Sequence, residues 1–365
     1  MSVGVIGRSK WELDTPALML DLGAMSRNIE RMADTFREAG VGWRPHTKAI
    51  KTPAIAHKLI AAGAHGVTCA KVGEAEVMAA AGIRDILIAN QVVGDQKITR
   101  AINLLPHADL IVAVDDRGNV EQLGRAACMK GIPLRVVVEV NLGMNRAGVE
   151  PGQAALELSR VVARTEGLRF AGLMGWEGHT VKIADADEKR RTVEASLRLL
   201  IESAERCRQA GLPVEIVSCG GTGTYSTSAR YPGVTEVQAG GGIFCDVYYH
   251  DAMHVEHEYA LTVLATVTSR PTPTRIVCDS GKKTMSTDAA QPRPLIDAPV
   301  ASMAFSAEHV RIELAEPRAE PRVGDRIEFV VGYSDTTTML HDELYATRDD
   351  CVEQVWPILG RGKLR

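Results

Sequence analysis

Short apolar runs alternate with longer amphipathic segments between residues 15 and 245. The apolar runs are rich in Val, Ile and Leu without polar alternation, which is typical of strands buried on both faces of a parallel sheet. Several amphipathic segments end at a glycine that can cap a helix C-terminus: Gly40, Gly63, Gly82 and Gly211. We therefore predict strands over residues 17–20, 66–70, 85–90, 110–114, 135–140, 170–174 and 215–218, and helices over residues 23–39, 52–62, 73–81, 151–165 and 185–210.

These seven or eight strand–helix repeats predict a (β/α)8 barrel. The alternative is a doubly wound sheet, but the G-x-G-x-x-G turn typical of that fold is missing after the first predicted strand. Past residue 255 the pattern changes to short β-like runs separated by Pro and Gly, at 259–268, 274–279, 310–314, 326–331 and 344–347. The expected fold class is α/β: a barrel of residues 15–255, and a smaller, mostly β domain of residues 256–365 with residues 1–14.

Composition and charge limit the kinds of binding partner and the cellular location expected of this chain. The chain has 365 residues and a net charge of −4, with acids and bases interspersed, so we expect no nucleic-acid partner and no membrane partner. The N-terminal segment does not have the pattern of a signal peptide, and no apolar run is long enough to span a bilayer. The seven cysteines are scattered and form no C-x-x-C pair, which is typical of reduced thiols. We therefore expect a cytoplasmic protein.

Residues 43–53 place a lysine among other basic side chains. The segment follows the first predicted helix, so it should hold the second barrel strand, with Lys48 near the strand end where barrel enzymes place their chemistry. Burial beside Arg44, His46 and Lys51 should favour the neutral amine of Lys48, the form that attacks an aldehyde. The alternative is an ordinary surface lysine.

Two Gly-rich turns, residues 218–224 and 238–242, follow the last predicted barrel strands. Glycine lets backbone N–H groups approach an anion closely, and these turns are the usual phosphate site of a barrel. Neither matches the nucleotide P-loop, because no Lys-Ser/Thr follows. We expect an anion site here, in preference to two plain turns.

Two more segments carry polar side chains after predicted strands. Arg146 could hold a phenolate or carboxylate at the barrel mouth, or be a solvated loop residue. Trp176 and His179 could flank a flat cofactor ring, with Glu177 bonded to it, or could serve packing and a loop.

In the β domain, Tyr333, Asp335, His341 and Asp342 lie at close spacing. They could form a metal site or an acid–base pair, or cap a turn, and the spacing alone leaves all three open.

Together these segments resemble the fold-type III pyridoxal phosphate enzymes with an alanine-racemase-like barrel, and more narrowly the D-threonine aldolase and D-serine dehydratase family. The matching stretches cover nearly the whole chain: residues 14–16, 44–48, 143–146, 220–224, 279–281, 286–288, 306–309, 324–325 and 355–357.

The resemblance implies a specific cofactor site and assembly. It implies that Lys48 carries pyridoxal 5′-phosphate as a Schiff base and that Arg146 lies near the phenolic oxygen of the cofactor. It also implies a small amino-acid substrate and a homodimer in which the β domain of one subunit closes the barrel mouth of the other. The other implied cofactor-binding residues are Trp176, His179, Gly221, Thr222, Gly240 and Gly241.

Two positions depart from the family pattern. The family usually has a histidine two residues after the lysine, where this chain has Ile50, and a His-x-Asp or His-x-Cys metal pair, where it has Tyr333 and Asp335. Tyrosine is a poor replacement for histidine as a metal ligand. Asp335 is the candidate metal ligand that remains, and His341 could join it. The binding of a divalent metal is therefore in question.

The resemblance admits several reactions. Hydroxide is a poor leaving group without a Lewis acid, whereas retro-aldol cleavage needs only a base on the β-hydroxyl, so the sequence favours an aldolase acting on D-3-hydroxy amino acids over a dehydratase. Lys48, Tyr333 and His46 are the candidate catalytic residues, with His341 as another possible base. The alternatives are a D-serine or 3-hydroxyaspartate dehydratase, an amino-acid racemase with Lys48 and Tyr333 as its bases, and a non-catalytic cofactor carrier.

Overall fold

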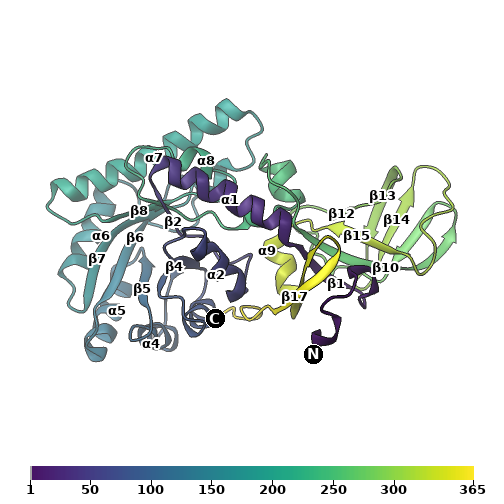
Figure 1. Ribbon diagram of the computed structural model, residues 1–365. Helices are drawn as coiled ribbons and strands as arrows, with labels where there is room; N and C mark the ends of the chain where they lie inside the picture. Colours follow the sequence, from purple (N-terminus) through teal and green to yellow (C-terminus); the bar gives the residue numbers. More distant parts are fainter. Residues whose placement is uncertain (1) are drawn as a thin grey trace. The chain divides into compact units, whose positions relative to one another are not determined.

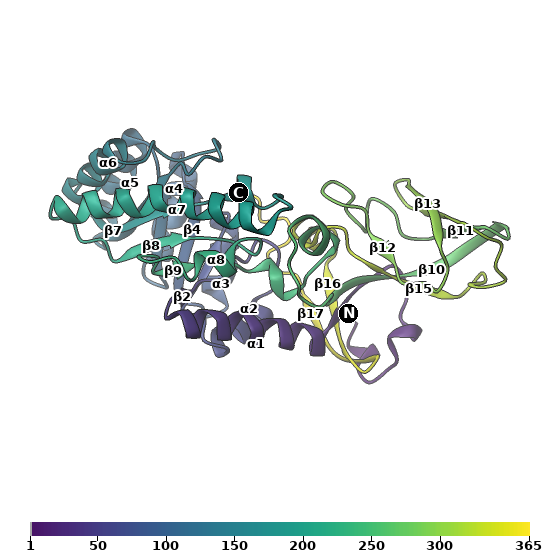
Figure 2. The ribbon, with the colours of Figure 1, turned by 90° about the horizontal axis from the view of Figure 1, so that it is seen from above.

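The computed structural model describes residues 2–365, which form two compact units. One unit comprises residues 30–241 and 362–365, and the other comprises residues up to 29 together with residues 242–361. Figures 1 and 2 show the ribbon in two views. The predicted domain boundary at residue 255 stays a prediction, and each unit is described by itself.

The first unit is a barrel of eight parallel strands in the order β2-β9-β8-β7-β6-β5-β4-β3. The sheet closes where the segment that follows β2 pairs with β3: the N–H of Thr68 donates to the carbonyl of Pro45 at 2.9 Å, and the N–H of Thr47 donates to the carbonyl of Thr68 at 2.7 Å. The predicted barrel is therefore confirmed. The strands are β2 Gly42–Trp43, β3 Val67–Cys69, β4 Asp85–Gln91, β5 Asp109–Val114, β6 Leu134–Val140, β7 Leu168–Gly175, β8 Ile216–Cys219 and β9 Glu236–Val237.

Helices connect successive barrel strands, as the amphipathic pattern predicts. The glycines expected at helix ends have left-handed backbones, for example Gly40 at φ +67° and Gly211 at φ +78°. Apolar side chains of β4 to β8, such as Leu87, Ile111 and Val137, form a buried core cluster. The connecting helices are α2 Pro53–Ala61, α3 Val72–Ala80, α4 Asp95–Leu104, α5 Arg117–Lys130, α6 Gln153–Arg164, α7 Ala186–Gln209 and α8 Tyr225–Ser228. Helix α1 Leu22–Ala39 precedes the first barrel strand, and its residues are divided between the two units.

The second unit contains a nine-stranded, mostly antiparallel sheet, which confirms the predicted β domain. Three of its strands were not predicted from the sequence: β12 Arg293–Pro294, β13 Val300–Phe305 and β17 Cys351–Pro357. The other strands are β1 Ala17–Asp21, β10 Leu261–Thr272, β11 Arg275–Cys278, β14 Val310–Leu314, β15 Arg326–Val330 and β16 Glu343–Arg348. This unit also contains the π-helix Tyr248–Ala252 and the short helix α9 Ser334–Thr337.

One strand assignment is wrong. The apolar run of residues 17–20, expected as the first barrel strand, forms β1, which pairs with β10 and β16 in the nine-stranded sheet. Its burial on both faces looks the same in either sheet, so the sequence pattern could not choose its partners. The strand that leads to Lys48 is therefore the first strand of the barrel.

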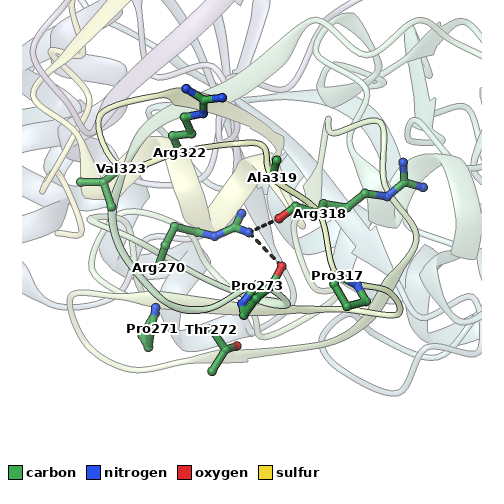
Figure 3. A pocket seen from close by; sticks show the side chains of 9 residues that line it. All are labelled: Arg270, Pro271, Thr272, Pro273, Pro317, Arg318, Ala319, Arg322 and Val323. Carbon is green, nitrogen blue, oxygen red and sulfur yellow. Dashed lines mark hydrogen bonds between the residues drawn. The ribbon is translucent and has the colours of Figure 1, made fainter.

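An open hollow of about 600 Å³ lies among loops of the β unit (Figure 3). The Arg270 guanidinium spans one side of it and donates to the carbonyls of Pro273 and Arg318, at 2.9 and 2.8 Å. None of the nine residues that line the hollow belongs to the predicted site. Among the described residues, no helix combines the length and hydropathy that a membrane crossing requires.

Candidate active site

Lys48 lies in a turn that directly follows the first barrel strand. The turn is tied down by the N–H groups of Ile50 and Lys51, which donate to the Thr47 carbonyl at 3.0 and 2.8 Å. Lys48 is exposed in this turn, and its backbone N–H donates to Nδ1 of His46 at 3.3 Å. The lysine side chain is thus at the carboxyl end of the strand, the position that barrel enzymes use for chemistry.

The expected cationic neighbours of Lys48 are paired with carboxylates. The buried Arg44 guanidinium donates to Glu236 at 2.9 Å and to Asp85 at 2.6 Å. Lys51 is also buried, and its Nζ lies 2.5 Å from Glu74. Both cations therefore have carboxylate partners within the barrel.

The His46 ring is held in its neutral form. Burial lowers the pKa of His46 well below its usual range, and the nearby charges of Lys48, Lys51 and Arg146 lower it further. Its Nδ1 accepts the Lys48 backbone N–H, and the ring also hydrogen-bonds to the Thr68 backbone. His46 therefore connects the lysine turn to β3 through hydrogen bonds.

The two Gly-rich turns lie next to these residues at the ends of β8 and β9. A Cβ on Gly240 would come within 2.2 Å of the His46 carbonyl oxygen, so only glycine lets the second turn pass the lysine-bearing strand. A Cβ on Gly221 would come within 2.5 Å of the Trp176 ring. The close packing explains why glycine is needed at both positions.

The N–H groups of Gly240 and Gly241 are available to a ligand. Both residues are buried, yet neither amide donates a hydrogen bond to any other residue that the structure describes. A buried amide without an acceptor is costly, and an anion would satisfy it. This observation fits a phosphate group at the second turn.

Glu177 braces the first Gly-rich turn. The carboxylate is fully buried, accepts the hydroxyls of Thr224 and Ser228, both at 2.7 Å, and accepts the N–H of Gly220 at 3.3 Å. Burial raises its pKa, and these hydrogen bonds act in the opposite direction. The idea that Glu177 bonds to a cofactor ring is replaced by this bracing role, which motif spacing alone could not reveal.

Arg146 and His179 lie on the loops after β6 and β7, and both are exposed. These loops touch, since a Cβ on Gly143 would come within 3.1 Å of the His179 ring. Arg146 also faces Glu139, whose pKa is raised by burial while Gln91 and Arg146 lower it. The predicted barrel residues thus gather at the carboxyl ends of β2, β6, β7, β8 and β9.

Tyr333 and Asp335 belong to the other unit, within a cluster of tyrosines and acids. Tyr249 donates its hydroxyl to Oδ1 of Asp335 at 3.1 Å, and Tyr333 also hydrogen-bonds to Asp335. The rings of Tyr248 and Tyr249 pack edge-on against Tyr333, with centroids 5.1 and 5.8 Å away. Burial and the Asp335 charge raise the pKa of Tyr333, so the phenol keeps its proton at neutral pH.

Asp246 fixes this cluster and was not predicted from the sequence. It is fully buried, and its carboxylate accepts the N–H groups of Tyr249 and Ser334, at 2.8 and 2.7 Å. Burial raises the pKa of Asp246 to about 7. The contacts join the π-helix to the turn that carries Tyr333 and Asp335, and π-helical turns are frequent at functional sites.

The residues around Asp335 do not fit a metal site of the family type. His341 is engaged elsewhere, with Nε2 2.8 Å from the Thr284 carbonyl, and burial lowers its pKa. Among residues 2–365, no group of three or more His, Cys, Asp or Glu side chains is arranged to hold a metal ion. Asp335 is instead surrounded by phenols, which are poor ligands for Mg²⁺ or Mn²⁺.

Comparison with known proteins gives consistent matches over nearly the whole length. Residues 20–247 match the alanine racemase N-terminal domain, and residues 260–347 match a putative serine dehydratase domain. The chain is 33% identical to a D-threonine aldolase of an Arthrobacter species (96% of this chain, 93% of the relative) and 33% identical to a 3-hydroxy-D-aspartate aldolase of Paracoccus denitrificans strain Pd 1222 (98% and 94%). The crystal structure of D-threonine aldolase from Filomicrobium marinum superposes with a TM-score of 0.96 at 36% identity, covering 99% of both chains.

Proposed function

Since the chain belongs to the alanine-racemase-like family of pyridoxal phosphate enzymes that includes the D-threonine aldolases, we propose that it is a lyase that cleaves D-3-hydroxy amino acids into glycine and an aldehyde. The observation that carries the proposal is the similarity to two aldolases along almost the entire chain, together with a lysine and two Gly-rich turns at one end of the barrel.

Pyridoxal 5′-phosphate fits the residues at the barrel mouth. Lys48 would hold the cofactor covalently, and the N–H groups of Gly240 and Gly241, which have no acceptor in the described protein, would bind its phosphate with Gly221 and Thr222. Once bound, the pyridoxal ring supplies an electron sink for the bond broken at Cα. Arg146 would lie near the phenolic oxygen, and Trp176 and His179 would flank the ring.

The chain's own groups would orient and deprotonate the substrate. His46 serves as a positioning residue, because its ring hydrogen-bonds to the backbone of Lys48 and keeps the lysine turn in place. Tyr333 would act in the deprotonation of the β-hydroxyl, which releases the aldehyde as the Cα–Cβ bond breaks. Because its phenol is itself protonated at neutral pH, Tyr333 must pass its own proton to a neighbouring group as it takes the proton of the substrate. We further propose a homodimer in which the β domain of one subunit closes the barrel mouth of the other. The cytoplasmic location stays a prediction.

A screen of D- and L-3-hydroxy amino acids tests the reaction, with glycine, aldehyde and ammonia measured separately on the cofactor-loaded protein. The proposal expects glycine and aldehyde in equal amounts from the D-isomers. Release of ammonia and a keto acid would favour a dehydratase, in line with the match of residues 260–347 to a serine dehydratase domain. Loss of optical rotation without a new product would indicate a racemase, and the absence of any turnover would indicate a cofactor carrier.

A further inference from the structure

Asp335 is hydrogen-bonded to the phenols of Tyr249 and Tyr333, and these three side chains form a phenol-and-carboxylate cluster. Such a cluster can move a proton from the β-hydroxyl of the proposed substrate. We propose that this protein works without a divalent metal ion and that Tyr333 and Asp335 form a proton relay for the β-hydroxyl of the substrate. The proposal rests on the lyase function proposed above and specifies how that function is achieved.

The first support is the occupation of the Asp335 carboxylate. One of its oxygens already accepts the Tyr249 hydroxyl at 3.1 Å, and Tyr333 hydrogen-bonds to the same carboxylate. A metal ion at Asp335 would compete with both phenols for the carboxylate and would find phenol oxygens in place of imidazole or carboxylate ligands. The contacts therefore indicate that the Asp335 carboxylate is stabilised by hydrogen bonds from phenols and not by a bound metal cation.

The second support is the rigidity of the arrangement. The Asp246 carboxylate accepts two backbone N–H groups, that of Tyr249 and that of Ser334, which lies between Tyr333 and Asp335 in the sequence. The Tyr248 and Tyr249 rings pack edge-on against the Tyr333 ring and restrict its rotation. Because hydrogen-bonded phenol and carboxylate groups are held in place before a ligand arrives, the relay needs no reorganisation of the protein.

The proton balance of the relay is simple. The substrate hydroxyl gives its proton to the Tyr333 oxygen as Tyr333 passes its own proton to Asp335. The oxygen of the substrate then forms the aldehyde C=O bond while the Cα–Cβ bond breaks. The electron pair of the broken Cα–Cβ bond stays with the Cα fragment, and this fragment becomes glycine after it gains a proton. No oxidant, reductant or metal takes part.

The test uses the full chain loaded with pyridoxal phosphate and dialysed against EDTA, with bound metals measured by mass spectrometry. Glycine release from D-threonine is then followed with EDTA, with added Mn²⁺ and with added Mg²⁺. We expect rates that agree within about twofold under all three conditions, since no step needs a Lewis acid. Activity that disappears with EDTA and returns with Mn²⁺ or Mg²⁺ would overturn the metal-free proposal while leaving the lyase function intact.

Variants test the relay itself. Tyr333→Phe and Asp335→Asn should each lower kcat by about 100-fold or more, and the double variant should be no slower than the worse single variant, because both side chains serve one proton transfer. Tyr345→Phe is the matched control: its hydroxyl lies 3.4 Å from Glu343 on β16, outside the cluster, and its kcat should not change. Multiplicative losses in the double variant, or full activity in Tyr333→Phe, would refute the relay. A wild-type protein that releases no glycine with or without metal would refute the lyase function as well.

Discussion

Arg44 provides a quantitative test of the ion network inside the barrel. Its guanidinium is 2% exposed and lies between Glu236, at the start of β9, and Asp85, at the start of β4. Burial alone would raise the pKa of Glu236, but the charge of Arg44 and the hydrogen bonds from Arg44 and His65 lower it to about 2 from the usual 4.5. The difference corresponds to about 3 kcal/mol of folding free energy at neutral pH.

Arg44→Met should remove this stabilisation and leave a buried carboxylate without its main partner, at a cost of about 3–5 kcal/mol at pH 7. The sign of the pH dependence follows from the lowered pKa of Glu236. Its contribution to stability is complete above the unfolded value of 4.5 and is lost as the pH falls toward 2. The deficit of the variant should therefore shrink by about 2 kcal/mol between pH 7 and pH 3.

Urea unfolding of the cofactor-free protein, followed by circular dichroism at both pH values, measures this deficit. Arg169→Met is the matched control, because Arg169 forms an ion pair with Glu215 at 2.7 Å in which both side chains are about half exposed. Loss of this pair should lower the free energy of unfolding by less than about 1 kcal/mol. A deficit for Arg44→Met as small as that of the control, or one that does not change with pH, would refute the assignment of Arg44 to a structural network.

Three further predictions concern the site and the assembly. Lys51→Met should lower the free energy of unfolding by about 3 kcal/mol, because it leaves Glu74, 2% exposed, without its cation; an unchanged urea midpoint would contradict this. Gly240→Ala should weaken pyridoxal phosphate binding about tenfold or more, because its Cβ meets the His46 carbonyl. Gly4→Ala, whose Cβ would have no described atom within 4 Å, should bind the cofactor normally, and equal affinities of the two variants in a titration of cofactor absorbance would argue against the phosphate site. Light scattering of the loaded protein should give twice the mass of one chain, and a monomer mass would rule out the homodimer.

The barrel was predictable because parallel strands are buried on both faces and leave continuous apolar runs. Strand β6 shows this: residues 135–140 were expected and Leu134–Val140 is observed, with one half-buried position among buried ones. By contrast, no position of β13 Val300–Phe305 is buried, and its half-buried and exposed positions follow neither a continuous buried run nor a regular alternation, so it was missed. The run at β1 was recognised as a strand, but pairing partners are set by tertiary packing, which no local pattern encodes.

The site was predictable where local chemistry defines it, and not where it depends on distant partners. Gly-rich turns after strands indicated an anion site at Gly240, in agreement with its buried amide, which donates to no other residue of the described part of the chain. The partner of Arg44 is 192 residues away at Glu236, and the partner of Asp335 is Tyr249, 86 residues away. Such contacts form only in the fold, so the sequence could not show that these charged groups are already paired.

The proposed chemistry depends on the covalent attachment of the cofactor to Lys48, which borohydride reduction can trap. The protein is incubated with pyridoxal 5′-phosphate, reduced with borohydride, digested and sequenced by mass spectrometry. We expect a pyridoxyl-phosphate group on the Lys48 side chain, and none on the Lys51 side chain, which is paired with Glu74. A protein that takes up no label, or one labelled at another lysine while Lys48 stays unmodified, would contradict it.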